Sequence, residues 1–253
     1  MSSLIAICCH DTVDNGRTNY TEQTLRCLMR TVPESNRIVV IDNGSCEATK
    51  GLLQYWKERI TIITLPENIG TARAINLAMR MREPHETFIK IDNDCVIHSD
   101  TWVSEMEQCI ERDNTIGVVG LKRKDLAESP NSKHPFYIST LDMLPHEPGE
   151  RWIVVENVHH VMGTCQMLSP ALIEKAGYFF QKNKYGLDDS DMSYRSELLG
   201  FRNCFLPHIE IDHIDVGGDD YTNWKHQESG NAMADYGQMC QEYRDGVRSL
   251  YYD

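Results

Sequence analysis

The chain has 253 residues, of which 41% are hydrophobic and 25% are charged, the composition of an ordinary globular protein. Its formal net charge is −13, from 25 Lys and Arg against 38 Asp and Glu. This balance disfavours a protein whose main surface binds nucleic acid, and it disfavours a nucleic-acid acceptor, because phosphate contacts require clustered basic side chains. A local basic groove remains compatible with it.

Short apolar runs alternate with segments of helical spacing in the first half of the chain. The apolar runs predict strands at residues 4–9, 38–41, 60–65 and 88–91. The segments between them predict helices at residues 21–31, 48–57 and 71–82. This alternation favours an α/β fold with a mostly parallel, Rossmann-like central sheet and helices on both faces. Ligands bind beyond the carboxyl ends of such strands, so we expect one shared rim for the polar clusters at residues 42–45, 68–70 and 92–94.

The cluster after the fourth strand carries two acids separated by one residue, Asp92 and Asp94. In an extended backbone, residues i and i+2 point to the same side, which would bring the two carboxylates together. Hard anionic oxygens of this kind suit Mg²⁺ or Mn²⁺, cations that use one or two carboxylates and take further ligands from substrate phosphates. Asp and Asn also follow strands simply because they form turns, and the pattern alone leaves that reading open.

The second half of the chain is less regular. Strands are predicted at 116–120, 151–156, 160–169 and 205–211, and helices at 170–176 and 188–199. The polar, proline-bearing stretch 122–149 reads as a long loop, and an acidic helical tail follows residue 218. No linker divides the chain, so we expect a single domain over 1–253. Its parts would be a donor-binding half at 1–120, an acceptor and catalytic half with a smaller β region at 121–217, and the tail at 218–253.

Nine cysteines are spread over the apolar segments without a C-x-x-C pair, which indicates reduced thiols in a reducing compartment. The N-terminus lacks the apolar run of a signal peptide, and no window approaches the roughly 18 apolar residues of a membrane span. We therefore expect a cytoplasmic protein without a transmembrane anchor, which would meet a membrane only peripherally.

An ordered series of segments resembles family 2 glycosyltransferases of the GT-A fold. The matching segments are Ile-Asp-Asn-Gly-Ser at 41–45, Asn-Ile-Gly-Thr-Ala-Arg at 68–73, Ile-Asp-Asn-Asp at 91–94, the stretches 161–168 and 176–179, Tyr-Gly-Leu-Asp-Asp-Ser-Asp at 185–191, and Asp-His at 212–213. Single pieces are weak, but their order and spacing over about residues 4–215 make the resemblance specific. It implies an inverting, metal-dependent transfer of a sugar from a nucleotide diphosphate to an acceptor hydroxyl.

The resemblance also implies roles for single residues on the donor side. Asp94 would ligate Mn²⁺ or Mg²⁺ directly through its part of a D-x-D motif, and His213 would be a further ligand. Asp92 would contact the ribose or a metal-bound water. The implied donor-binding residues are Asp42, Asn68, Gly70, Arg73, Asp92 and Asn93.

The acidic start of the helix at 188–199 carries the implied general base, Asp189. An ionised carboxylate is favoured at a helix N-terminus and could accept the proton of an acceptor hydroxyl. The alternative is that Asp188, Asp189 and Asp191 only cap the helix. Asp191 is expected to pair with Arg195 at i+4, and the shorter acid Asp188, where the family usually has Glu, leaves open which carboxylate reaches the acceptor.

Two other functions remain as alternatives. A sugar-phosphate nucleotidylyltransferase would use a related sheet, but it should carry a glycine-rich phosphate loop after the first strand, where residues 10–17 hold one glycine. A non-catalytic nucleotide-sugar-binding protein has no need for the full set of acids. A UDP-sugar is the favoured donor, with GDP- and dTDP-sugars as alternatives, and the acceptor would be a glycan, a lipid-linked glycan or a protein hydroxyl.

Overall fold

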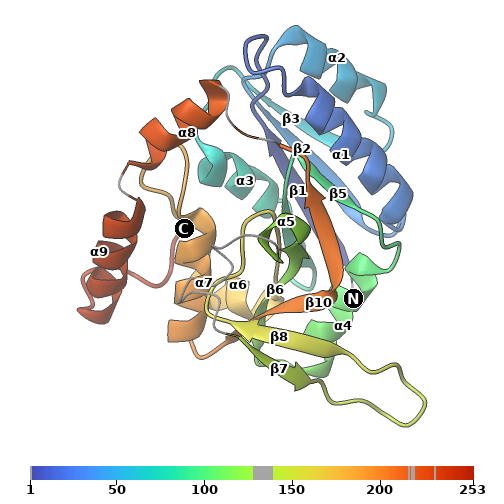
Figure 1. Ribbon diagram of the computed structural model, residues 1–253, viewed down its shortest axis with the longest axis vertical. Helices are drawn as coiled ribbons and strands as arrows, with labels where there is room; N and C mark the ends of the chain where they lie inside the picture. The colour runs from blue at the N-terminus through green and yellow to red at the C-terminus, as the bar shows by residue number, and fades with distance from the viewer. Residues whose placement is uncertain (1, 128–138, 216, 218–219, 231) are drawn as a thin grey trace.

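The structure is a computed structural model that describes residues 2–127, 139–215, 217, 220–230 and 232–253 (Figure 1). Its strands are β1 (Ser3–Cys9), β2 (Arg37–Asn43), β3 (Thr61–Leu65), β4 (Thr87–Asp92), β5 (Cys95–Ile97), β6 (Ile116–Arg123), β7 (Thr140–Met143), β8 (Val154–Val158), β9 (Cys165–Leu168) and β10 (Arg202–His213). Its helices are α1 (Thr18–Thr31), α2 (Glu47–Tyr55), α3 (Thr71–Met79), α4 (Trp102–Arg112), α5 (Lys124–Ala127), α6 (Pro170–Ala176), α7 (Asp188–Leu198), α8 (Asp220–Ser229) and α9 (Ala232–Arg244).

The described strands form one sheet in the order β3-β2-β1-β4-β9-β6-β10-β8-β7, with β5 paired to β10 outside this path. The four strands β3, β2, β1 and β4 are parallel to one another, and β10 is parallel to β6. Strand β9 enters antiparallel between β4 and β6, and β7 and β8 form an antiparallel pair at the far end. The predicted α/β fold with a largely parallel sheet is confirmed, and the β7–β8 pair extends this same sheet rather than forming a separate β region.

Helices cover both faces of the sheet because successive side chains of its buried strands point to opposite sides. In β1, Ile5 and Ile7 pack into a cluster that includes side chains of α1, α2 and α4, whereas Leu4 and Ala6 pack into a second cluster with α3, α6 and α7. This arrangement explains why β1, β2 and β4 read as continuous apolar runs. It also holds their carboxyl ends at a single edge.

The second half of the chain departs from the prediction in three places. Residues 160–169 are not one strand, because β9 begins only at Cys165 and the preceding residues form a loop. The strand expected at 151–156 lies instead at Val154–Val158, and the segment expected to be a loop contains α5 and β7. Residues 128–138 of that segment lie outside the described residues. Polar and apolar residues do not alternate strictly at 160–164, so the periodicity of the sequence could not locate the start of β9.

The C-terminal segment is anchored to a buried ion pair of helix α7 by a hydrogen bond from Tyr243. Arg195 Nε lies 2.7 Å from Asp191 Oδ2, and both side chains are fully buried, which confirms the predicted i,i+4 pair. The Tyr243 hydroxyl of α9 donates to the other oxygen of Asp191 at 2.6 Å. Arg195 also donates to the Ala176 carbonyl at 2.7 Å.

Within the described ranges, no helix has the length and apolar character required to cross a membrane.

Candidate active site

A pocket of about 320 Å³ opens at the edge where β1 and β4 end and α7 begins. Its walls include the carboxylates of Asp92, Asp94 and Asp189 together with the imidazole of His213. These residues come from three segments that are distant in sequence, and the fold brings them together. The predicted shared rim for the 92–94 cluster therefore exists, and it also carries the predicted base.

The two acids of the 92–94 segment do not lie on one extended strand. Asp92 is the last residue of β4, and Asn93 and Asp94 form the turn that leads into β5. The two acids do line the same pocket, as predicted, but a turn brings them there and not an extended backbone with i, i+2 spacing. Burial raises the pKa of Asp92 to about 7, and the nearby Asp94 carboxylate adds to the rise against the attraction of Lys90.

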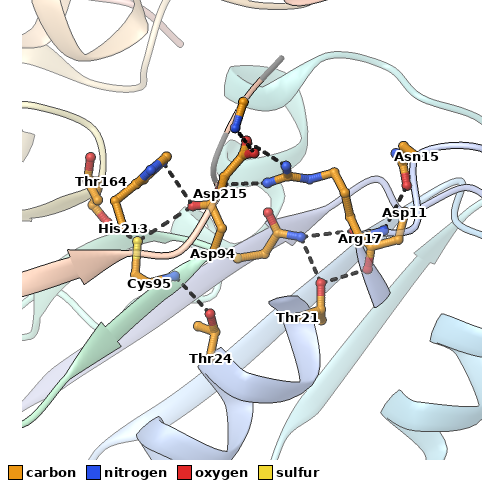
Figure 2. Close-up of polar contacts among 12 residues, drawn as sticks. Asp11, Asn15, Arg17, Thr21, Thr24, Asp94, Cys95, Thr164, His213 and Asp215 are labelled. Atoms are coloured by element: carbon orange, nitrogen blue, oxygen red, sulfur yellow. Dashed lines mark hydrogen bonds and ion pairs between the residues drawn. The ribbon is translucent and has the colours of Figure 1, made fainter. Parts of the chain in front are cut away.

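The side chain of Asn93 is buried and hydrogen-bonded to Asp11 and Thr21, two residues that are labelled in Figure 2. Its amide donates to Asp11 Oδ1 at 2.9 Å and to Thr21 Oγ1 at 2.7 Å. These bonds connect the turn to helix α1. Asn93 also lines the pocket, but its observed hydrogen bonds hold the turn in place.

Asp94 divides its two oxygens between two different neighbours. Oδ2 accepts a short hydrogen bond from the guanidinium of Arg17, and Oδ1 faces His213 Nε2 at 3.5 Å. His213 reaches this position because β10 pairs antiparallel with β5, opposite Cys95. Burial lowers the pKa of His213, and nearby Arg123 adds to this effect, so the imidazole is neutral at neutral pH and able to ligate a metal.

The residues Asp94 and His213 fit a divalent cation of the Mn²⁺ or Mg²⁺ type. Ligands that lie about 2.1 Å from one cation can be up to about 4.2 Å apart, and the 3.5 Å between Oδ1 and Nε2 falls inside that limit. Among the residues that the structure describes, no three His, Cys, Asp or Glu side chains gather into a ligand group. Two protein ligands suit a cation that completes its shell with substrate phosphates and water.

Asp189 is held on the opposite wall by a tight loop. Its Oδ2 accepts from the Gly163 amide at 2.7 Å and lies 3.3 Å from His160 Nε2. A Cβ atom on Gly163 would come within 2.7 Å of Lys90 Nζ and 3.3 Å of Asp189 Cβ, so a larger residue here would force Lys90 to move. Burial alone would raise the pKa of Asp189, but His160 holds it well below its usual range, with help from Lys90 and the Gly163 amide.

The neighbouring acid Asp188 is already paired. Its Oδ2 accepts a hydrogen bond from Lys90 Nζ at 2.5 Å, and the side chains are only 9% and 5% exposed. Burial would lower the pKa of Lys90, but the surrounding carboxylates, led by Asp188, raise it above its usual value. Both acids at the start of α7 line the pocket, but Asp188 is engaged by Lys90, whereas Asp189 is held by the Gly163 amide and His160.

Helix α7, which carries Asp188 and Asp189, begins after a residue with a strained backbone. Leu187, the residue before the helix, has φ +64°, which is costly for a residue with a branched side chain. Leu187 lines the pocket together with Asp188 and Asp189. Backbone strain of this kind is concentrated at binding and catalytic sites.

The other predicted donor-side residues lie along the edge next to the pocket, but they do not line it. Asp42 is fully buried; its Oδ1 accepts from the Ser45 amide at 2.7 Å, and its Oδ2 has no hydrogen-bond partner among the described residues. Asn68 does not cap α3, since its Oδ1 accepts from the Gly70 amide at 2.9 Å and Gly70 is the N-cap, with φ +95°. Arg73 is exposed.

Several residues that line the pocket were missed from the sequence. Arg17, Lys90, Arg123 and Lys225 bring basic groups to a pocket that the sequence presented as acidic. His160, which pairs with Asp189 although it does not line the pocket, was also not among the predicted site residues. No spacing pattern connects these residues to Asp94 or Asp189, because each meets its partner only through the tertiary fold.

Comparison with known proteins gives one family and a set of similar folds. The model of the family "Glycosyl transferase family 2" matches residues 5–177. No curated protein sequence matches the chain. A mannosyltransferase, PcManGT from Pyrobaculum calidifontis, in complex with GDP-Man and Mn²⁺, is similar over 88% of this chain with a TM-score of 0.64 and 18% identity.

Two further solved structures are similar. TarS 1–349 of S. aureus in complex with UDP covers 96% of this chain, with a TM-score of 0.62 and 15% identity, and the match spans 70% of that chain. GalNAc-T7 with UDP, GalNAc and Mn²⁺ covers 84% of this chain, with a TM-score of 0.61 and 14% identity. The chain spans 59% of the mannosyltransferase and 44% of GalNAc-T7. At these identities the similarity establishes the fold.

Proposed function

The chain belongs to glycosyl transferase family 2, and on that premise we propose that it transfers a sugar from a nucleotide-diphosphate sugar to an acceptor hydroxyl with inversion at the anomeric carbon. The observation that carries the proposal is one pocket with a metal-type pair, Asp94 and His213, on one wall and an ionised base candidate, Asp189, on another. An inverting displacement needs a group at each end of the reacting centre, one for the leaving diphosphate and one for the attacking hydroxyl.

Asp189 is proposed to accept the proton of the acceptor hydroxyl. Its depressed pKa keeps it ionised at neutral pH, and the Gly163 amide and His160 hold its position. Asp188 is proposed to serve as the partner of Lys90, and this pairing supports Asp189 over Asp188 as the base.

Asp94 and His213, with Asp92 close by, are proposed to hold Mn²⁺ or Mg²⁺. When bound, the cation would supply positive charge that neutralises the leaving diphosphate. Support comes from the PcManGT and GalNAc-T7 complexes, both of which contain Mn²⁺. The chain's own Arg123 and Lys225 line the same pocket and add positive charge on the diphosphate side.

The nucleotide end of the donor is proposed to lie along the edge formed by β2 and β3, towards Asp42, Asn68 and Gly70. Parallel strands β3, β2, β1 and β4 place these residues on the same edge as the pocket. The unpartnered Oδ2 of the buried Asp42 supports this assignment, because a buried carboxylate oxygen without a donor is costly. Asn93 and Arg73 stay in the proposal as donor-side residues, Arg73 through its place in the first turn of α3.

Nucleotide diphosphates, tested as ligands, distinguish the proposed function from its alternatives. We expect UDP, GDP or dTDP, with Mn²⁺, to raise the Tm of the protein, since a ligand at 100 times its Kd stabilises by about 2.7 kcal/mol. Chelation of the metal should remove most of the shift. UDP is the first choice, since UDP is present in the TarS and GalNAc-T7 structures.

The alternatives predict different results in the same screen. A nucleotidylyltransferase would be stabilised by a nucleoside triphosphate and would release pyrophosphate from it. A non-catalytic binding protein would bind a nucleotide sugar without hydrolysing or transferring it. If no nucleotide diphosphate at millimolar concentration changes the Tm, the proposed function is wrong.

The free thiols of all nine cysteines support action in a reducing, cytoplasmic compartment.

Replacing His160 with glutamine is expected to move the acidic limb of the pH–rate profile to higher pH. His160 contributes most to the attraction that lowers the pKa of Asp189. Glutamine removes the charge but keeps a hydrogen-bond donor, so the pKa of Asp189 rises and the base is protonated at a higher pH than in the wild type. The pH dependence of nucleotide release from the donor measures this, and an unchanged acidic limb would contradict a base role for Asp189. His159→Gln is the matched control, because His159 is exposed and pairs with Glu197.

A further inference from the structure

Arg17 lies almost fully buried, at 1% exposure, directly before helix α1. Its guanidinium bridges two buried carboxylates (Figure 2). One nitrogen donates to Asp94 Oδ2 in a short bond, and the other lies 2.7 Å from Asp215 Oδ2. The Asp94 and Asp215 side chains are only 4% and 5% exposed. The ring of Tyr20 lies 5.2 Å below the guanidinium carbon, so the side chain is fixed from several directions.

The position of Arg17 bears directly on the proposed metal site. A buried carboxylate without a counter-charge is strongly unfavourable, and Arg17 supplies that charge to Asp94. The same carboxylate turns its other oxygen, Oδ1, to His213. A divalent cation held between Oδ1 and His213 would therefore share one carboxylate with a fixed positive charge. Like charges at such short range repel, even where the effective dielectric constant is moderate.

Asp215 gives Arg17 a second acceptor. If the bond to Asp94 breaks, the guanidinium keeps its partner at Asp215, so no buried unpaired arginine results. Lys225 of α8 lies 3.2 Å from the same Asp215 oxygen and shares its charge. The arrangement allows Asp94 to change partners while the rest of the network stays intact.

We propose that Arg17 is a resident counter-cation of the metal site, which neutralises Asp94 in the donor-free protein and with which a divalent cation competes for that carboxylate. This inference rests on the proposed function, because it takes Asp94 and His213 as the metal ligands. It has a consequence for the order of binding. The metal binds weakly to the protein alone, and the negative charges of the donor diphosphate are needed to offset the repulsion by Arg17.

The test is a titration of the full-length protein with Mn²⁺ in the absence of any donor, followed by the electron paramagnetic resonance signal of free hydrated Mn²⁺. Arg17→Met is expected to bind Mn²⁺ at least about tenfold more tightly than the wild type, because the competing charge is gone. Adding UDP or GDP should tighten Mn²⁺ binding strongly in the wild type and much less in Arg17→Met. Arg26→Met is the matched control, since Arg26 lies in α1, the helix that follows Arg17, in an exposed pair with Glu22; the Mn²⁺ affinity of this variant should equal that of the wild type.

Two further variants keep the result interpretable. Arg17→Met combined with Asp215→Asn also removes the charge of the carboxylate that loses Arg17 and keeps only Lys225, and this double variant should show the same tighter Mn²⁺ binding if the single variant folds poorly. Asp94→Asn should abolish the binding in every background. Equal or weaker Mn²⁺ affinity in both Arg17 variants overturns the inference, as does Mn²⁺ binding that survives Asp94→Asn.

The outcomes separate the inference from the function on which it rests. If nucleotide diphosphates bind but Arg17→Met leaves Mn²⁺ affinity unchanged, the counter-cation role is wrong and the proposed function stands. If Mn²⁺ binds more tightly to Arg17→Met but no nucleotide diphosphate binds to either protein, the counter-cation role stands and the proposed function is wrong.

Discussion

Replacing Asp189 with asparagine is expected to lower the rate of sugar transfer by about 10² to 10⁴, the usual contribution of a positioned general base. Asparagine has the same shape and can still accept from the Gly163 amide, so the loop should keep its position. What disappears is the ability to take a proton from the acceptor hydroxyl. The loss should appear in kcat, while the Kd of the donor stays close to that of the wild type.

Nucleotide release from the donor measures the rate, and calorimetric titration with the nucleotide diphosphate measures the binding. Glu197→Gln is a suitable control because Glu197 lies on the same helix, pairs with exposed His159, and does not line the pocket. A rate near that of the wild type for Asp189→Asn would remove Asp189 from the mechanism.

Replacing Lys90 with methionine is expected to lower the free energy of unfolding by about 3 to 5 kcal/mol, the effect of removing one partner of a buried ion pair. Lys90 Nζ lies 2.5 Å from Asp188 Oδ2, and both side chains are more than nine-tenths buried. Methionine fills similar space without charge, which leaves Asp188 uncompensated next to other acids. For a chain of this size the expected fall in Tm is about 6 to 20 °C.

Thermal denaturation provides the measurement, and two variants frame it. Lys182→Met removes the same residue type from a pair with Asp235 in which the lysine is 65% exposed, so it should cost less than about 1 kcal/mol. Lys90→Met with Asp188→Asn removes both charges and should recover much of the loss. If the single variant is as stable as the wild type, the pair does not stabilise the floor of the pocket.

The first half of the fold could be predicted well because its strands are buried on both faces and its helices have clear spacing. Strands near residues 4–9 and 88–91 and the helix starting at Thr71 were confirmed with small shifts at their ends. The region around β8 and β9 was predicted less well. Strand β9 pairs antiparallel with two strands that are distant in sequence, and it is too short for its periodicity to be recognised in the sequence.

The candidate site divides in the same way. Asp92, Asp94, Asp189 and His213 come together in one pocket, as their order along the chain suggested through the family resemblance. The basic partners could not be predicted, because Arg17 and Lys90 meet Asp94 and Asp188 only across the folded sheet. Sequence patterns report periodicity along one segment, whereas these contacts depend on which strands become neighbours.

The place of β10 in the sheet has a consequence for how the molecule forms. This strand comes late in the chain, yet it lies between β6 and β8. While residues 202–213 are still inside the ribosome, strands β6 and β8 lack their partner in the nascent chain. Their unpaired edges can then form hydrogen bonds with other chains and promote aggregation. Long-range pairings of this kind slow folding. The placement of His213, a proposed metal ligand, is then coupled to completion of the sheet, so a ribosome-bound intermediate would lack the Asp94–His213 pair until its last strand is inserted.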